Sequence, residues 1–142
     1  MTLEHNIRRA YINTLLDGGF TRLADKTINP TEGYIVGGVT EPTTMHEDKY
    51  HPDFRTTYER TSRATNHYAK FKELWNQYEL QLDDYTSNLY EAGMGVGTWI
   101  HEGQIYFDLV QHLYNLDVAT DIAKKRGEIA IYDCKNQKDI LL

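Results

Sequence analysis

The sequence predicts an α+β protein with a small, mainly antiparallel sheet packed by helices, and three observations support this fold class. Residues 96–101 and 105–110 are two runs of alternating apolar residues around a Glu-Gly turn, which is the pattern of a β-hairpin. Residues 117–126 form an amphipathic run that ends in cations and a glycine, which is typical of a helix. Residues 129–133 are β-branched and aromatic, and they predict a strand after that helix.

The first third of the chain predicts one helix and two short strands. Apolar residues recur at helical spacing over residues 3–15, and two glycines follow, so an N-terminal helix is expected there. Residues 20–23 and 34–36 are short apolar runs beside turn residues, and each predicts a strand. Residues 39–55 contain two prolines and many polar residues and are expected to be a polar loop. The chain of 142 residues is expected to form a single domain, residues 1–142.

The longest helix is expected over about residues 56–82. Thr56 and Glu59 fit a capping box at its start. A seam of apolar and aromatic residues follows, with spacings of three and four: Thr61, Ala64, Tyr68, Phe71, Trp75, Tyr78 and Leu82. Two interpretations stay open. Either the seam lies across the sheet as core, or the aromatic residues form the contact of a homo-oligomer, a seam made of Tyr68, Phe71, Trp75 and Tyr78.

The negative charge is concentrated in the second half of the chain. The net charge is −6, and residues 73–123 contain nine carboxylates without a single Lys or Arg. Such a field repels phosphate backbones and attracts basic partners, so direct nucleic-acid binding is not expected. We predict an acidic surface for a basic partner protein, made of Glu73, Glu79, Asp83, Asp84 and Glu91.

A basic stripe lies on the expected long helix, beside the apolar seam. Arg60, Arg63, His67 and Lys70 recur at helical spacing, so their side chains share one face. Cations grouped in this way can hold a small anionic ligand, and Trp99 is a candidate aromatic side chain to complete such a site. The alternative is that the basic face is only solvated.

Motifs for catalysis or metal binding are missing from the sequence. It has no Gly-x-Ser-x-Gly, HExxH, paired-cysteine or phosphate-loop motif, so neither an enzyme nor a cofactor nor a metal is expected. His46, Glu47, Asp48, His51 and Asp53 are interpreted as solvated loop residues, because they lack the spacing of a metal site. A small hydrolase with a site assembled in space stays an alternative, since six histidines and 21 acidic residues offer many combinations.

Composition also bears on the compartment. The single cysteine, Cys134, excludes an internal disulfide and fits a reducing cytoplasm. No apolar run approaches the ~18 residues that a membrane-spanning helix needs, so no membrane association is expected.

The pattern GTW, turn, IYFD, helix, RGE and AIYD resembles small uncharacterised accessory proteins of bacteriophages and mobile elements. The resemblance covers residues 14–38 and 93–139. It implies a protein in the cytoplasm of an infected bacterium that binds and blocks a host factor, for example as an anti-defence protein. A structural, oligomerising component of a phage particle or complex is the alternative that this resemblance leaves open.

Overall fold

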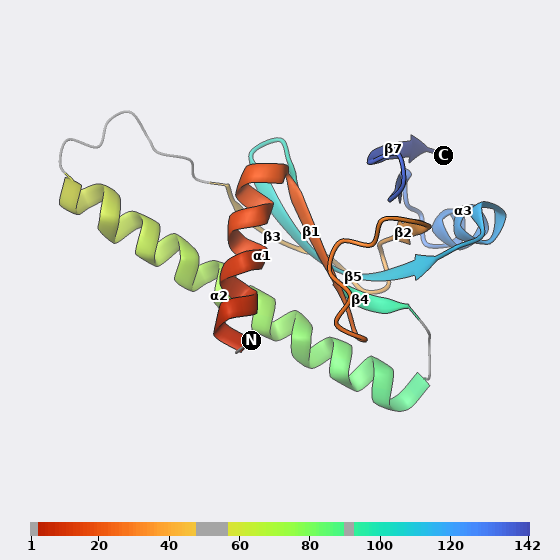
Figure 1. Ribbon diagram of the computed structural model, residues 1–142, viewed down its shortest axis with the longest axis horizontal. Helices are drawn as coiled ribbons and strands as arrows, with labels where there is room; N and C mark the ends of the chain where they lie inside the picture. Colours follow the sequence, from red (N-terminus) through yellow and green to blue (C-terminus); the bar gives the residue numbers. More distant parts are fainter. Residues whose placement is uncertain (1–2, 48–56, 90–92) are drawn as a thin grey trace.

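The computed structural model describes residues 3–47, 57–89 and 93–142, with side chains described for residues 6–47, 65–84 and 93–142. These residues form three helices and one seven-stranded antiparallel sheet, which confirms the predicted fold class (Figure 1). In chain order the elements are α1 (Leu3–Asp17), β1 (Gly19–Leu23), β2 (Tyr34–Val36), β3 (Thr43–His46), α2 (Thr57–Leu89), β4 (Met94–His101), β5 (Gln104–Leu113), α3 (Leu116–Lys125), β6 (Ala130–Asp133) and β7 (Lys138–Leu141).

The predicted hairpin of β4 and β5 lies in the middle of the sheet. Its turn is Glu102-Gly103, and both residues have positive φ (49° and 77°), as a tight hairpin turn that matches the strand twist requires. The strand order is β1-β4-β5-β2-β6-β7, and β3 also pairs with β5. The strand after α3, β6, therefore lies between β2 and β7 and not beside the hairpin.

The segment between β2 and β3 bulges away from the hairpin. Val36 of β2 is opposite Gln111, and Thr43 of β3 is opposite Phe107. Residues 37–42 therefore face only residues 108–110 of β5. Because residues 37–42 outnumber the residues of β5 that they face, they cannot all pair with β5, and part of the segment bends away from the sheet. We call residues 37–42 the bulge segment.

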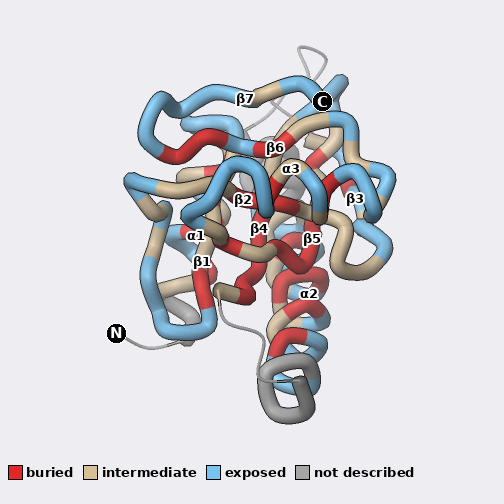
Figure 2. The backbone as a smooth tube through the Cα atoms, turned by 90° about the vertical axis from the view of Figure 1, so that its right-hand side faces the viewer, coloured by how far each residue is buried: buried red, intermediate tan, exposed pale blue. Residues whose placement is uncertain are grey.

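The main hydrophobic core lies between α2 and the β4–β5 hairpin, with α1 beside them. Phe71, Trp75 and Tyr78 of α2 are no more than 1% exposed, and Phe71 contacts Phe107 with ring centroids 4.9 Å apart. Figure 2 shows these buried turns of α2 in red where the helix meets the sheet. The aromatic seam is therefore core within one chain, which corrects its interpretation as an oligomer contact. The fourth seam residue, Tyr68, is partly buried against the same core, where its ring lies near that of Tyr11.

A smaller hydrophobic cluster lies under α3. Asn115 caps this helix, as its Oδ1 accepts a hydrogen bond from the Val118 N–H at 3.0 Å. Ala119 and Ala123 are buried against β2 and β6, whereas Val118 of the same helix is exposed. Small alanines at the contact let the helix approach the sheet closely.

Three boundaries differ from the sequence prediction. The polar loop expected over residues 39–55 contains β3, since Thr43 to His46 pair with residues 104–107 of β5, on the side away from β4. The long helix continues past residue 82 to Leu89, because the polar residues after Leu82 include neither Gly nor Pro. A further strand, β7, follows the last predicted strand and pairs with β6.

The described part of the chain has no helix that is long and apolar enough to cross a membrane.

Candidate functional site

The bulge segment lies against a buried acid, Asp108. Asp108 lies in the middle of β5 and is 1% exposed. Its Oδ2 accepts a hydrogen bond from the Gly38 N–H at 2.8 Å. Its Oδ1 is buried and has no hydrogen-bond partner among the described residues. An unpaired buried carboxyl oxygen is costly, so this side chain needs a physical explanation.

Two glycines let a second carboxyl group approach Asp108. A methyl group on Gly37 would overlap both Asp108 Oδ2 and Glu128 Oε1, so both oxygens lie on the same side of Gly37. Gly38 has a φ of 75°, and a methyl group there would lie 2.9 Å from the Glu128 carboxyl carbon. Both glycines directly follow β2, where the chain leaves its pairing with β5.

Arg126 places a positive charge beside the two acids. It is the C-cap residue of α3, and its guanidinium donates to Gln111 Oε1 at 2.8 Å and to the Gly37 carbonyl at 3.4 Å. The guanidinium is therefore held by neutral acceptors of β5 and of the bulge segment. We call Asp108, Glu128 and Arg126, together with Gly37 and Gly38, the carboxyl pair site.

The pKa of Asp108 is raised to about 7, chiefly by burial and also by the nearby Glu128 charge, against the lowering effects of the Gly38 N–H and Arg126. Burial also raises the pKa of Glu128, and Arg126 opposes this shift. The nearby Glu128 charge disfavours a charge on Asp108. With a pKa of about 7, Asp108 is protonated in a large fraction of molecules near neutral pH, and the protonated carboxyl group can act as a donor.

A raised carboxyl pKa is a property of many catalytic acids, but a catalytic acid must also reach its substrate. Asp108 is covered by the bulge segment and has almost no contact with solvent. In this conformation the carboxyl pair can hold the bulge segment in place and can bind a proton. Its geometry thus favours a structural role.

The described residues of the predicted anionic-ligand site, His67, Lys70 and Trp99, are not brought together. His67 is held by structural contacts, with Nδ1 2.7 Å from the Tyr11 hydroxyl and Nε2 2.7 Å from the His46 carbonyl. Lys70 is exposed, 3.8 Å from Glu73. The Arg60 and Arg63 side chains lie outside the described residues.

Trp99 lies on the face of the sheet away from this helix. Its neighbour Thr98 points toward α1, where its hydroxyl bonds that of Thr14 at 2.6 Å. Because successive side chains of a strand alternate between faces, Trp99 points the other way and stacks on Tyr106, with ring centroids 5.2 Å apart. The aromatic partner proposed for the basic stripe is therefore on the opposite side of the sheet.

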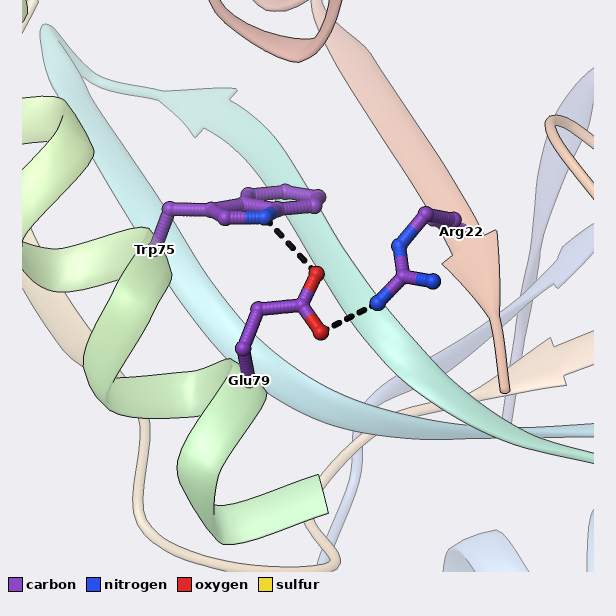
Figure 3. Close-up of polar contacts among 3 residues, drawn as sticks. All are labelled: Arg22, Trp75 and Glu79. Carbon is purple, nitrogen blue, oxygen red and sulfur yellow. Dashed lines mark hydrogen bonds and ion pairs between the residues drawn. The ribbon is translucent and has the colours of Figure 1, made fainter. Parts of the chain in front are cut away.

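Three of the five residues of the predicted acidic surface are exposed in the structure. Glu73, Asp83 and Asp84 are exposed on α2, and Glu91 lies outside the described residues. Glu79 is different, because its carboxylate accepts a hydrogen bond from Trp75 Nε1 at 2.9 Å and forms an ion pair with Arg22 of β1 (Figure 3). Its side chain is only 17% exposed, so Glu79 fastens α2 to the sheet and is not part of a partner surface.

The structure also locates several other candidate residues. His46 lies in β3, while Asp48, His51 and Asp53 lie outside the described residues. The described side chains contain no group of three or more His, Cys, Asp or Glu residues that could hold a metal ion. Burial raises the pKa of the Cys134 thiol to about 11, so its reactive thiolate form is disfavoured.

The carboxyl pair site was missed by sequence reasoning. One signal for it does exist, since Asp108 is a lone carboxylate inside the apolar run Ile-Tyr-Phe-Asp-Leu-Val. Its partners Glu128 and Gly37 come from distant parts of the chain, and only the fold brings them to Asp108.

No protein-family model, curated protein or solved structure matches this chain. Function is therefore inferred from the side chains described above.

Proposed function

We propose that the protein is a binding protein, without catalytic activity of its own, that docks on a basic surface of another protein through the outer face of α2. One observation carries the proposal. Glu73, Gln77, Leu80 and Asp84 follow one another at spacings of four, three and four, and all four are exposed, so they form one stripe along the helix. Asp83 lies beside this stripe, and residues 73–84 include no Lys or Arg. We call these five residues the α2 outer face.

The α2 outer face has the chemistry of a docking surface. Leu80 is 68% exposed and lies between the carboxylates, where it can enter an apolar pocket of a partner. The surrounding carboxylates attract a basic partner and orient it. The opposite face of the helix is fixed in the core by Phe71 and Tyr78, so α2 presents its outer face without having to order on binding.

The sequence resemblance supplies a biological setting for this proposal. In an infected bacterium the partner would be a host protein with a basic groove, and occupying that groove would block its function. A nuclease or other defence protein that binds nucleic acid has such a groove, because it must attract phosphates. The proposed role is therefore an accessory, anti-defence role in the host cytoplasm.

The test uses a charge reversal on the α2 outer face. The variant Glu73→Lys, Asp83→Lys and Asp84→Lys changes three exposed carboxylates and leaves the buried Glu79 in place. The control variant Glu32→Lys, Glu102→Lys and Asp121→Lys makes the same change in net charge at exposed positions elsewhere. Each tagged protein is used to capture bacterial proteins, the retained proteins are identified by mass spectrometry, and binding of the purified partner is measured by calorimetry.

We expect one partner to bind the wild type and the control variant with similar affinity. Its affinity for the α2 variant should be at least tenfold lower. Leu80→Ser, which changes no charge, should weaken the same binding, since it removes the apolar contact. Circular dichroism and thermal melting show whether each variant is folded. A partner that binds all of the folded variants equally well would refute docking through the α2 outer face.

A further inference from the structure

The edges of the sheet differ in how they are closed. At one edge, residues 27–29 fold back along β1. Thr21 N–H donates to Asn29 Oδ1 at 2.9 Å, Asn29 N–H donates to the Thr21 carbonyl at 2.8 Å, and Leu23 N–H donates to the Thr27 carbonyl at 2.9 Å. This segment occupies the outward backbone groups of β1. A sheet edge covered in this way cannot accept another strand.

The opposite edge, β7, is open. β7 pairs with β6 on one side, and no described segment of the chain pairs with its other side. Figure 2 shows β7 along the upper rim of the molecule, coloured almost entirely as exposed. Its outward N–H and C=O groups are spaced as in a strand, so the surface that complements them is another strand.

Large apolar side chains are exposed at and beside β7, and the region carries no net charge. Leu141 is 78% exposed and Ile129 is 82% exposed. Residues 129–142 contain two lysines and two aspartates, so this region is neutral in a chain whose net charge is −6. Acidic surfaces elsewhere would repel a second copy of the chain, whereas this region does not.

We infer that β7 is the contact surface for a second copy of this chain, whose own β7 pairs with it in antiparallel fashion and continues the sheet across a two-fold axis. This inference does not rest on the proposed function, because β7 and the α2 outer face are separate surfaces.

The sequence of β7 indicates which part of the strand pairs with itself. When a two-fold axis stands perpendicular to a sheet, one residue faces its own copy across the axis. An axis at Lys138 or Asp139 would place like charges opposite each other, which is unfavourable. An axis at Leu141 places Leu141 opposite its own copy and Ile140 opposite Leu142, so that apolar side chains face each other, whereas an axis at Ile140 would place Leu141 opposite Asp139. The apolar half of β7 is therefore the part that pairs.

The small size of β7 limits the strength of this contact. Stable interfaces bury at least ~1,200 Å² in total, and a strand of four residues is short for such an interface. We therefore expect a reversible dimer whose population rises with protein concentration.

Sedimentation analysis over a concentration series tests the dimer. The wild type should rise from the monomer mass toward twice that mass. Leu141→Lys should remain a monomer over the whole series, because two like charges then lie at the axis. Leu80→Lys is the matched control, since it changes an exposed leucine on α2 in the same way, and it should associate as the wild type does.

Cysteine cross-linking tests the position of the contact. Leu141→Cys should form a disulfide-linked dimer on mild oxidation, whereas Glu102→Cys, at the exposed hairpin turn, should not. The native Cys134 is buried and common to both variants. A wild type that is monomeric at every concentration, or a Leu141→Lys variant that associates like the wild type, would overturn the inference.

Discussion

The Asp108 carboxyl group makes the stability of the fold depend on pH. Its pKa is about 7 in the folded protein, against 3.8 for an ordinary aspartate, so the folded state binds the proton more tightly than the unfolded chain. A raised acid pKa contributes stability that is fully present below the unfolded pKa and is lost as pH rises through the folded pKa. Three pKa units correspond to about 4 kcal/mol, so stability should fall by up to this amount between pH 4 and pH 8.

Asp108→Asn should remove most of this pH dependence. The amide keeps an oxygen to accept the Gly38 N–H and adds an N–H₂ group that can donate to Glu128. At pH 8 the variant should be more stable than the wild type by a few kcal/mol, measured by urea unfolding at pH 5 and pH 8. Asp121→Asn, at an exposed position on α3, should show the pH dependence of the wild type. Equal stability of the wild type at both pH values would contradict this account.

At the scale of elements, Glu79 connects α2 to the sheet. Its carboxylate pairs with Arg22 of β1 and accepts from Trp75 Nε1, and both charged side chains are largely buried (Figure 3). Glu79→Gln keeps an acceptor for the indole but leaves the Arg22 guanidinium without its counter-charge. Removing one partner of a largely buried pair should lower the unfolding free energy by about 2 kcal/mol, measured by chemical denaturation.

The matched control is Glu73→Gln, six residues earlier on the same helix. The Glu73 side chain is 59% exposed and lies 3.8 Å from Lys70, and exposed ion pairs contribute little. Its substitution should change the unfolding free energy by less than about 0.5 kcal/mol. Equal effects of the two substitutions would show that Glu79 does not fasten α2 to β1.

The type and order of most elements could be predicted from the sequence, because periodicity and turn residues are local signals. The hairpin turn at Glu102-Gly103 and the cap at Asn115 are examples. The strand β3 was missed, since of Thr43 to His46 only Met45 is buried and the run has no apolar alternation. Pairing with β5 makes that segment a strand, and a local pattern does not contain this information.

The candidate sites could be predicted only where exposure follows from position on a helix. Periodicity placed Glu73 and Asp84 on a helix but could not distinguish them from Glu79, whose environment depends on Arg22 of β1. Alternation in the hairpin assigns Asp108 to the same face as Trp99 but does not show what covers that face. Asp108 is buried because residues 37–42 bulge beside it and Glu128 follows α3. Both contacts are long-range.

At the scale of the whole molecule, the described buried hydrophobic residues form one large cluster, a small cluster under α3, and a third cluster of Ile35, Val110 and Cys134. The large cluster joins α1 and α2 to the sheet strands β1, β3, β4 and β5 and contains the largest buried side chains. The small cluster consists of Val36, Ala119, Ala123 and Ile131 with four partly buried neighbours. Because less apolar surface is buried around α3, β6 and β7, this part of the fold should have the lower local stability.

Native-state hydrogen exchange measures this difference directly. Amides of α3 and β6 should exchange through a partial opening that costs less free energy than the opening that exposes β4. Ile131→Ala should reduce protection in α3 and β6 while leaving β4 nearly unchanged, since Ile131 contributes to the small cluster alone. Phe71→Ala, in the large cluster, should reduce protection throughout the chain by about 3–5 kcal/mol, the cost of a large buried cavity. If Ile131→Ala reduces the protection of β4 and β6 equally, the two clusters unfold as one cooperative unit, and the open edge at β7 is as stable as the hairpin.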